Sequence, residues 1–193
     1  MDKIEIEPLK ISHREEFGAV LNSLSLVNVG AEIGCAWGGY AEKLLALWKG
    51  KKLFMVDPWN VQPSDVYKEK HNTDPGAQDH FETDYRQCLA LANRDPRVSL
   101  VRAMSINAAS NITDNSLDFV YIDANHSYNT VLEDMDAWYP KVRSSGVFSG
   151  HDFYEDTNYP HFCQVKPAVE RWMSEHNISF HTTDCSSWWS RKY

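Results

Sequence analysis

Carboxylates and imidazoles gather in two short segments, each placed just after an apolar run. The segment IDANHSY contains Asp123 and His126. The segment SGHDF contains His151 and Asp152. Carboxylate oxygens and imidazole nitrogens can hold one divalent cation, and an oxygen-rich set favours magnesium, calcium or manganese. A bound cation would orient a hydroxyl group and lower its pKa. Together the two segments predict a site that activates a hydroxyl group.

Proton transfer is the second chemistry that these residues allow. His126 follows Asp123 by three positions, and an imidazole with an unperturbed pKa of about 6.5 suits a general base near neutral pH. A helix-capping role, or a contact near a bound adenine, would explain His126 equally well. A functional role is favoured for Asp123, because an unpaired carboxylate at the end of a buried strand is costly.

A glycine-rich segment near the N-terminus predicts a ligand pocket. The stretch VGAEIGCAWGGY at 29–40 runs from an apolar strand through a turn into a helix. Gly34 and Gly38 permit a tight turn and a close approach of ligand to backbone. Glu32 precedes them, and a carboxylate there suits a cationic ligand better than a pyrophosphate. Asp57 ends the next apolar run and would accept hydrogen bonds from both hydroxyls of a ribose.

The pattern Glu32-x-Gly34-x-x-x-Gly38, followed by Asp57, resembles the class I S-adenosylmethionine-dependent methyltransferases. The resemblance implies that Gly34 faces the methionine part of the cofactor, together with Ala36, which stands where the family usually has glycine. It also implies a ribose at Asp57 and an adenine near the residues that follow Asp57. Ser105, after the third strand, matches the family's turn on the adenine side. The cofactor-binding positions implied in this way are Glu32, Gly34, Ala36, Trp37, Gly38, Asp57, Pro58, Trp59, Met104, Ser105, Asp123 and Ala124.

IDANHSY and SGHDF are similar to segments of small-molecule O-methyltransferases of the macrolide-sugar and catechol types. The similarity implies that Asp123, His151 and Asp152 bind a metal ion such as Mg²⁺, with His151 standing where relatives often have Asp or Glu. It also implies that His126, with Asp123, is catalytic and serves as the base. The expected reaction is O-methylation of a hydroxyl group on a small molecule, either a sugar or a phenolic metabolite.

The elements that must position these residues alternate along the chain. The expected strands are 27–33, 52–56, 97–102, 117–122, 142–149, 178–183 and 187–192. The expected helices are 9–24, 38–48, 79–94, 105–110, 130–139 and 164–175. This alternation predicts an α/β, Rossmann-like, doubly wound sheet of seven strands, mostly parallel with the last strand antiparallel, and helices on both faces. Ligands of such sheets bind beyond the carboxyl ends of the strands, where all the motifs would meet.

The chain is expected to form a single class I methyltransferase domain over residues 1–193. Residues 1–25 would form an N-terminal helical cap, and the polar stretch 58–79 a lid-like loop. The acceptor would lie between residues 58–80 and 151–163. Few residues are left for a separate substrate domain, so a second subunit of a homo-oligomer is an alternative source of the lid.

Composition limits the partners. The net charge is −8 and no dense basic run occurs, which argues against nucleic acid. No apolar run reaches 18 residues, so no membrane span is expected. The start of the chain lacks a secretory signal, and the four cysteines form no CxxC pair. We therefore expect a cytoplasmic protein with free thiols.

Three other functions fit parts of this pattern, one of them a metal-dependent hydroxylase-like activity, a name that related sequences carry. A non-catalytic module that binds S-adenosylmethionine and regulates a partner would carry the same glycine-rich motif. A nicotinamide-dependent oxidoreductase also uses a strand, a glycine-rich turn and a helix. Glu32 favours the cationic cofactor over the dinucleotide, and the carboxylates near 123 and 152 favour an enzyme over a module.

Overall fold

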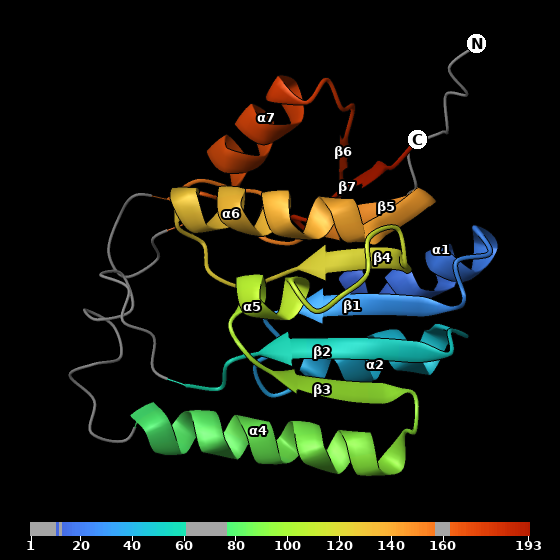
Figure 1. The fold of residues 1–193 in the computed structure, drawn as a ribbon, viewed down its shortest axis with the longest axis vertical. Coiled ribbons are helices and arrows are strands. Elements are labelled where there is room, and N and C mark those ends of the chain that lie inside the picture. Colours follow the sequence, from blue (N-terminus) through green and yellow to red (C-terminus); the bar gives the residue numbers. More distant parts are fainter. Residues whose placement is uncertain (1–10, 12, 61–76, 157–162) are drawn as a thin grey trace.

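A computed structural model describes residues 11, 13–60, 77–156 and 163–193. Its centre is a seven-stranded sheet with the order β3-β2-β1-β4-β5-β7-β6 (Figure 1). The strands are β1 (Val29–Ile33), β2 (Lys52–Asp57), β3 (Val98–Arg102), β4 (Leu117–Ile122), β5 (Val142–Gly150), β6 (His181–Thr182) and β7 (Trp188–Arg191). β1 to β5 are parallel, and β7 runs antiparallel to both of its neighbours. The predicted sheet, including its antiparallel last strand, is confirmed.

Helices cover both faces of the sheet, as expected (Figure 1). One apolar core contains residues of α1 (Phe17–Ser23), α2 (Gly39–Leu47) and α4 (Ala77–Arg94). The other core contains residues of α5 (Ser105–Ala109), α6 (Tyr128–Trp138) and α7 (Val165–Glu175). β4 lies between the two cores and is buried at all six positions. Burial on both faces explains why five of its six residues are apolar rather than alternating with polar ones. The exception, Asp118, is paired with Arg143 at 2.6 Å.

The register of the strands brings their ends to one edge. Ile33 of β1 pairs with Val56 of β2 and with Ile122 of β4, and Ile122 pairs with Gly150 of β5. The residues that follow these four along the chain are Gly34, Asp57, Asp123 and His151. The order of strands reverses between β1 and β4, so this edge is the switch point at which doubly wound sheets bind ligands.

Some boundaries differ from the sequence expectation. The helix expected from residue 9 is a 3₁₀ turn, η1 (Arg14–Glu16), followed by α1, and residues 1–10 and 12 lie outside the described residues. A second 3₁₀ turn, η2 (Tyr139–Lys141), follows α6, where a proline ends the α-helix. The expected lid, 58–79, falls mostly in 61–76, which also lies outside the described residues.

The remaining expectations concern cysteines and membranes. Cys35, Cys88, Cys163 and Cys185 are free thiols, as predicted. Within the described residues, no helix is both long and apolar enough to cross a bilayer.

Candidate active site

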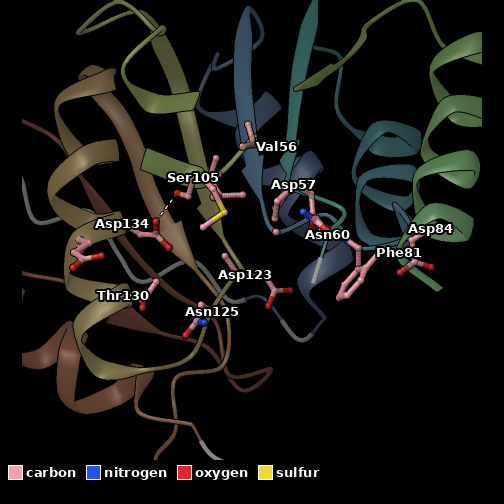
Figure 2. A pocket seen from close by; sticks show the side chains of 17 residues that line it. Val56, Asp57, Asn60, Phe81, Asp84, Ser105, Asp123, Asn125, Thr130 and Asp134 are labelled. Carbon is pink, nitrogen blue, oxygen red and sulfur yellow. Dashed lines mark hydrogen bonds between the residues drawn. The ribbon is translucent and has the colours of Figure 1, made fainter. Parts of the chain in front are cut away.

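A cavity of about 590 Å³ opens at the carboxyl edge of the sheet (Figure 2). That volume is in the range of sites for small molecules. The lining residues come from β1, β2, the segments after β3 and β4, α4 and α6; they are Ile33, Gly34, Ala36, Val56, Asp57, Pro58, Asn60, Phe81, Asp84, Met104, Ser105, Asp123, Ala124, Asn125, Thr130, Glu133 and Asp134. Eight of the positions predicted to bind the cofactor are in this set: Gly34, Ala36, Asp57, Pro58, Met104, Ser105, Asp123 and Ala124.

The turn after β1 explains the glycines of the motif. Gly34 has a φ of 86°, and a Cβ at this position would lie 2.1 Å from the carbonyl oxygen of Asp123. Gly38 also has a φ of 86° and closes the turn with a hydrogen bond from its amide to the carbonyl of Cys35. Ala36 has a φ of 45°, a left-handed conformation that costs an alanine about 1–2 kcal/mol. This conformation accounts for the glycine usually found there.

Asp57 forms the centre of one cavity wall. One carboxylate oxygen accepts a hydrogen bond from the Ala36 amide at 3.0 Å, and the other from the Trp59 amide at 2.8 Å. Burial raises the pKa of Asp57, and the backbone amides only partly offset that rise. Each carboxylate oxygen has more than one lone pair, so the carboxylate retains capacity for two ribose hydroxyls. Its position fits the predicted ribose contact.

The two tryptophans of the motif differ in burial. Trp59 is fully buried, packs against Tyr85 and donates its indole N–H to the Ala36 carbonyl at 2.7 Å. Its φ of 42° turns the side chain inward. Trp37 is 54% exposed, and its ring lies over Gly39. Neither side chain lines the cavity, and the position of Trp59 near the adenine stays a prediction.

Glu32 is buried and is not among the residues that line the cavity. Its side chain is 1% exposed, and Oε2 has no hydrogen-bond partner among the described residues. Burial is the main cause that raises the pKa of Glu32 well above its usual value, and Asp123 and Asp57 add to the rise. The folded protein therefore holds a proton on Glu32 at pH values where the unfolded chain has released it.

Replacing Glu32 with glutamine should stabilise the protein at neutral pH. Above the unfolded pKa of about 4.5 the unfolded state binds fewer protons, so wild-type stability falls by up to about 1.4 kcal/mol per pH unit while the folded state keeps its proton. Thermal melts of both proteins from pH 4 to pH 8 test this. The gain should grow with pH and disappear near pH 4, whereas the exposed Glu155→Gln should show none. Parallel curves for wild type and Glu32→Gln would contradict the prediction.

The charges around the cavity are of one sign. The lining carboxylates are Asp57, Asp84, Asp123, Glu133 and Asp134. The described lining residues include no lysine, arginine or histidine. Such a wall attracts a sulfonium and an ammonium group and repels a pyrophosphate. The electrostatics favour the cationic cofactor predicted from Glu32 over a nicotinamide dinucleotide.

A second group of side chains adjoins the cavity at Asp123. Ligand atoms of Asp123, His126 and Asp152 all lie within 4.8 Å of one another. His126 Nε2 is 3.1 Å from Asp152 Oδ2 and 3.8 Å from Asp123 Oδ1. The predicted approach of Asp123 and Asp152 is therefore confirmed. His151 differs from the prediction: its Nδ1 lies 2.9 Å from Asp152 Oδ1, and His126 takes its place in the described cluster.

Arg14 was not predicted as a site residue. Its guanidinium lies 2.6 Å from Asp123 Oδ2 and stacks on the ring of Tyr40 at 4.8 Å. Burial alone would raise the pKa of Asp123, but the hydrogen bond from His126 and the charges of His151 and Arg14 outweigh it and lower the pKa. Asp123 is therefore held as a carboxylate. Nothing in the local sequence around residue 14 points to a partner 109 positions away.

Comparison with known proteins identifies the family. A family model described as a methyltransferase domain matches residues 31–153, more than half of the chain. A search of curated proteins gave no match. Many solved structures share the fold, among them three at low identity.

One is provisionally assigned as a caffeoyl-CoA O-methyltransferase from Staphylococcus aureus. Its sequence is 12% identical, its TM-score is 0.64, and the match covers 97% of this chain and 86% of that chain. The second is the 1,6-didemethyltoxoflavin-N1-methyltransferase of Burkholderia thailandensis with bound S-adenosylhomocysteine, at 13% identity, TM-score 0.60 and coverage of 94% and 79%. The third is the spermidine synthase of Thermotoga maritima, at 18% identity, TM-score 0.57 and coverage of 93% and 59%. The chain thus belongs to the family of methyltransferase domains, with the class I Rossmann-like fold, and is an S-adenosylmethionine-dependent methyltransferase.

Proposed function

We propose that this enzyme methylates a hydroxyl group of a small molecule, a sugar or a phenolic metabolite, and that a divalent cation takes part. The observation that carries the proposal is the double position of Asp123. It lines the cofactor cavity and also belongs to the cluster with His126 and Asp152. An acceptor held at the cluster would therefore lie beside the methyl donor, the proximity that a methyl transfer requires.

The cluster fits a hard divalent cation. Two carboxylates and one imidazole, all from the carboxyl ends of β4 and β5, offer ligand atoms close together. Oxygen-rich sets of this kind favour magnesium or manganese. When bound there, such a cation would lower the pKa of an acceptor hydroxyl and orient it for attack.

The side chains around the cluster hold it in shape. Arg14 engages Oδ2 of Asp123, while Oδ1 is the oxygen nearer His126. His151 contacts Oδ1 of Asp152, while Oδ2 is the oxygen nearer His126. Each carboxylate is thereby oriented from its outer side, with its other oxygen toward His126. This arrangement favours His126 as the third ligand of a cation over its predicted role as a free base.

The acceptor class rests on the same geometry and on one similarity. The Staphylococcus aureus neighbour carries an O-methyltransferase assignment, which agrees with hydroxyl chemistry and leaves the acceptor open. The proposed acceptor region between 58–80 and 151–163 lies largely outside the described residues.

The decisive experiment measures methyl transfer from labelled S-adenosylmethionine to a panel of acceptors. The full chain is first treated with EDTA and desalted, then assayed alone and with Mg²⁺ or Mn²⁺ added. The panel contains sugars and catechols, each paired with an analogue in which one hydroxyl is replaced by an amine. We expect transfer to the hydroxyl compounds only, lowered by EDTA and restored by the cation.

The other outcomes identify which part of the proposal fails. Transfer to the amine analogues alone would overturn O-methylation. Full activity in EDTA would overturn the role of a cation and leave His126 as the candidate base. Binding of the cofactor without transfer to any acceptor in a broad panel would favour the non-catalytic module.

A further inference from the structure

A buried carboxyl group lies in the cavity wall opposite Phe81 and Asp84 (Figure 2). It belongs to Asp134, which faces inward from α6 and is 1% exposed. One of its oxygens, Oδ1, accepts a hydrogen bond from the hydroxyl of Ser105, and the Ser105 oxygen in turn accepts one from Trp138 Nε1 at 2.8 Å. Ser105 is the residue expected to follow β3 beside the adenine, so Asp134 adjoins the predicted adenine site.

The other oxygen of Asp134 is not accounted for by the fold. Oδ2 is buried and has no hydrogen-bond partner among the described residues. Within the part of the chain that the structure describes, no cation is paired with the carboxyl either: the groups that act on it are Ser105 and the neighbouring charge of Glu133. Burial raises the pKa of Asp134 to about 7. An acceptor that is buried and unsatisfied is costly, and here a ligand in the cavity would satisfy it.

A role confined to holding Ser105 does not require a carboxylate. The Ser105 hydroxyl uses one oxygen only, and an asparagine would supply that oxygen equally well. The second oxygen makes no hydrogen bond that holds α5 against α6. Its position on the cavity wall indicates an acceptor for a donor group on the ligand.

S-adenosylmethionine offers three kinds of donor: the ammonium group, the ribose hydroxyls and the 6-amino group of adenine. The predicted contacts assign the ribose to Asp57 and the methionine end to Gly34 and Ala36. The 6-amino group is the donor that remains. Met104 and Ser105 line the wall next to Asp134, in the position predicted for the base.

We propose that Asp134 is the specificity-determining residue for the adenine base, with Oδ2 accepting a hydrogen bond from the 6-amino group. The inference rests on the cofactor placement above. It adds that the enzyme distinguishes an amino group from a carbonyl at position 6 of the purine. Ser105 acts as a positioning residue, because its hydroxyl fixes Oδ1 and so directs Oδ2 into the cavity.

The test compares two ligands that differ only at this position. Calorimetric titrations with S-adenosylhomocysteine and with its hypoxanthine analogue, S-inosylhomocysteine, are run at pH 8.5, where the carboxyl group is ionised. Wild type should prefer S-adenosylhomocysteine by about tenfold or more. Asp134→Asn keeps an acceptor for Ser105 and presents an amide N–H₂ to the ligand, so it should lose affinity for S-adenosylhomocysteine and reverse the preference. Glu170→Gln, which replaces an exposed carboxyl on α7 that is not among the cavity-lining residues, should keep the wild-type ratio.

The results separate this inference from the cofactor assignment. A wild type that binds the two ligands equally would overturn the inference even if Asp134→Asn did not fold. An unchanged ratio in a folded Asp134→Asn would also overturn it, while leaving the cofactor placement intact. If wild type bound neither ligand, the cofactor placement and the inference would both be wrong.

Discussion

Replacing Asp57 with asparagine is expected to weaken binding of S-adenosylmethionine by about 10- to 100-fold. The expected ribose contact places two hydroxyl donors on one charged acceptor, and a hydrogen bond to a charged group contributes about 1.5–3 kcal/mol. Both oxygens of Asp57 already accept backbone amides, from Ala36 and Trp59. An asparagine retains one acceptor oxygen and turns the other into a donor, so it also breaks one of these contacts. Equilibrium titration with S-adenosylhomocysteine measures the loss.

The control must separate lost contacts from a loosened turn. Asp79→Asn removes an exposed carboxylate from the start of α4 and should leave affinity unchanged. Thermal melts of Asp57→Asn report how far the turn itself has relaxed. An affinity within twofold of wild type, in a protein that melts like wild type, would show that Asp57 does not hold the ribose.

Replacing His126 with alanine is expected to lower kcat by about 100-fold at a low, fixed Mg²⁺ concentration. If His126 is a ligand, as the cluster with Asp123 and Asp152 suggests, two carboxylates remain to hold the cation. Most of the loss should then be recovered at saturating Mg²⁺. If His126 is a general base instead, no Mg²⁺ concentration will restore kcat. Steady-state assays over a range of Mg²⁺ concentrations distinguish the two roles.

His80→Ala serves as the matched control, because His80 is exposed on α4 and lies outside the cluster. It should show the wild-type dependence on Mg²⁺. Full activity of His126→Ala at every Mg²⁺ concentration would remove His126 from the reaction altogether.

The sheet and the carboxylates expected to bind ligands could be predicted from the sequence, because each depends on a pattern of neighbouring residues. Each central strand is a short apolar run, and Asp57 and Asp123 mark where two of these runs end. Parallel pairing then brings the ends together without further information, as the shared register of Ile33, Val56 and Ile122 shows. The family motif added the identity of the cofactor to this geometry.

The features that sequence reasoning missed depend on contacts between distant segments. Arg14 meets Asp123 because η1 packs against α2, near the residue that follows the carboxyl end of β4. Trp59 is buried: its backbone adopts a positive φ, and its indole N–H donates a hydrogen bond to the Ala36 carbonyl. The periodicity of α6 predicts that Asp134 is on a helix, but it does not predict that a carboxylate faces the cavity. Charge and aromatic character alone do not give side-chain direction.

The close packing at Gly34 has a consequence for how such an enzyme can change its substrate. The backbones that follow β1 and β4 approach so closely there that even a methyl group would collide with the Asp123 carbonyl. The separation between the cofactor turn and Asp123 is thus fixed by main chain and not by replaceable side chains. In the proposed reaction that separation sets how far the methyl group travels. The side chains that select the acceptor can therefore change, while the distance between the cofactor turn and Asp123 stays the same.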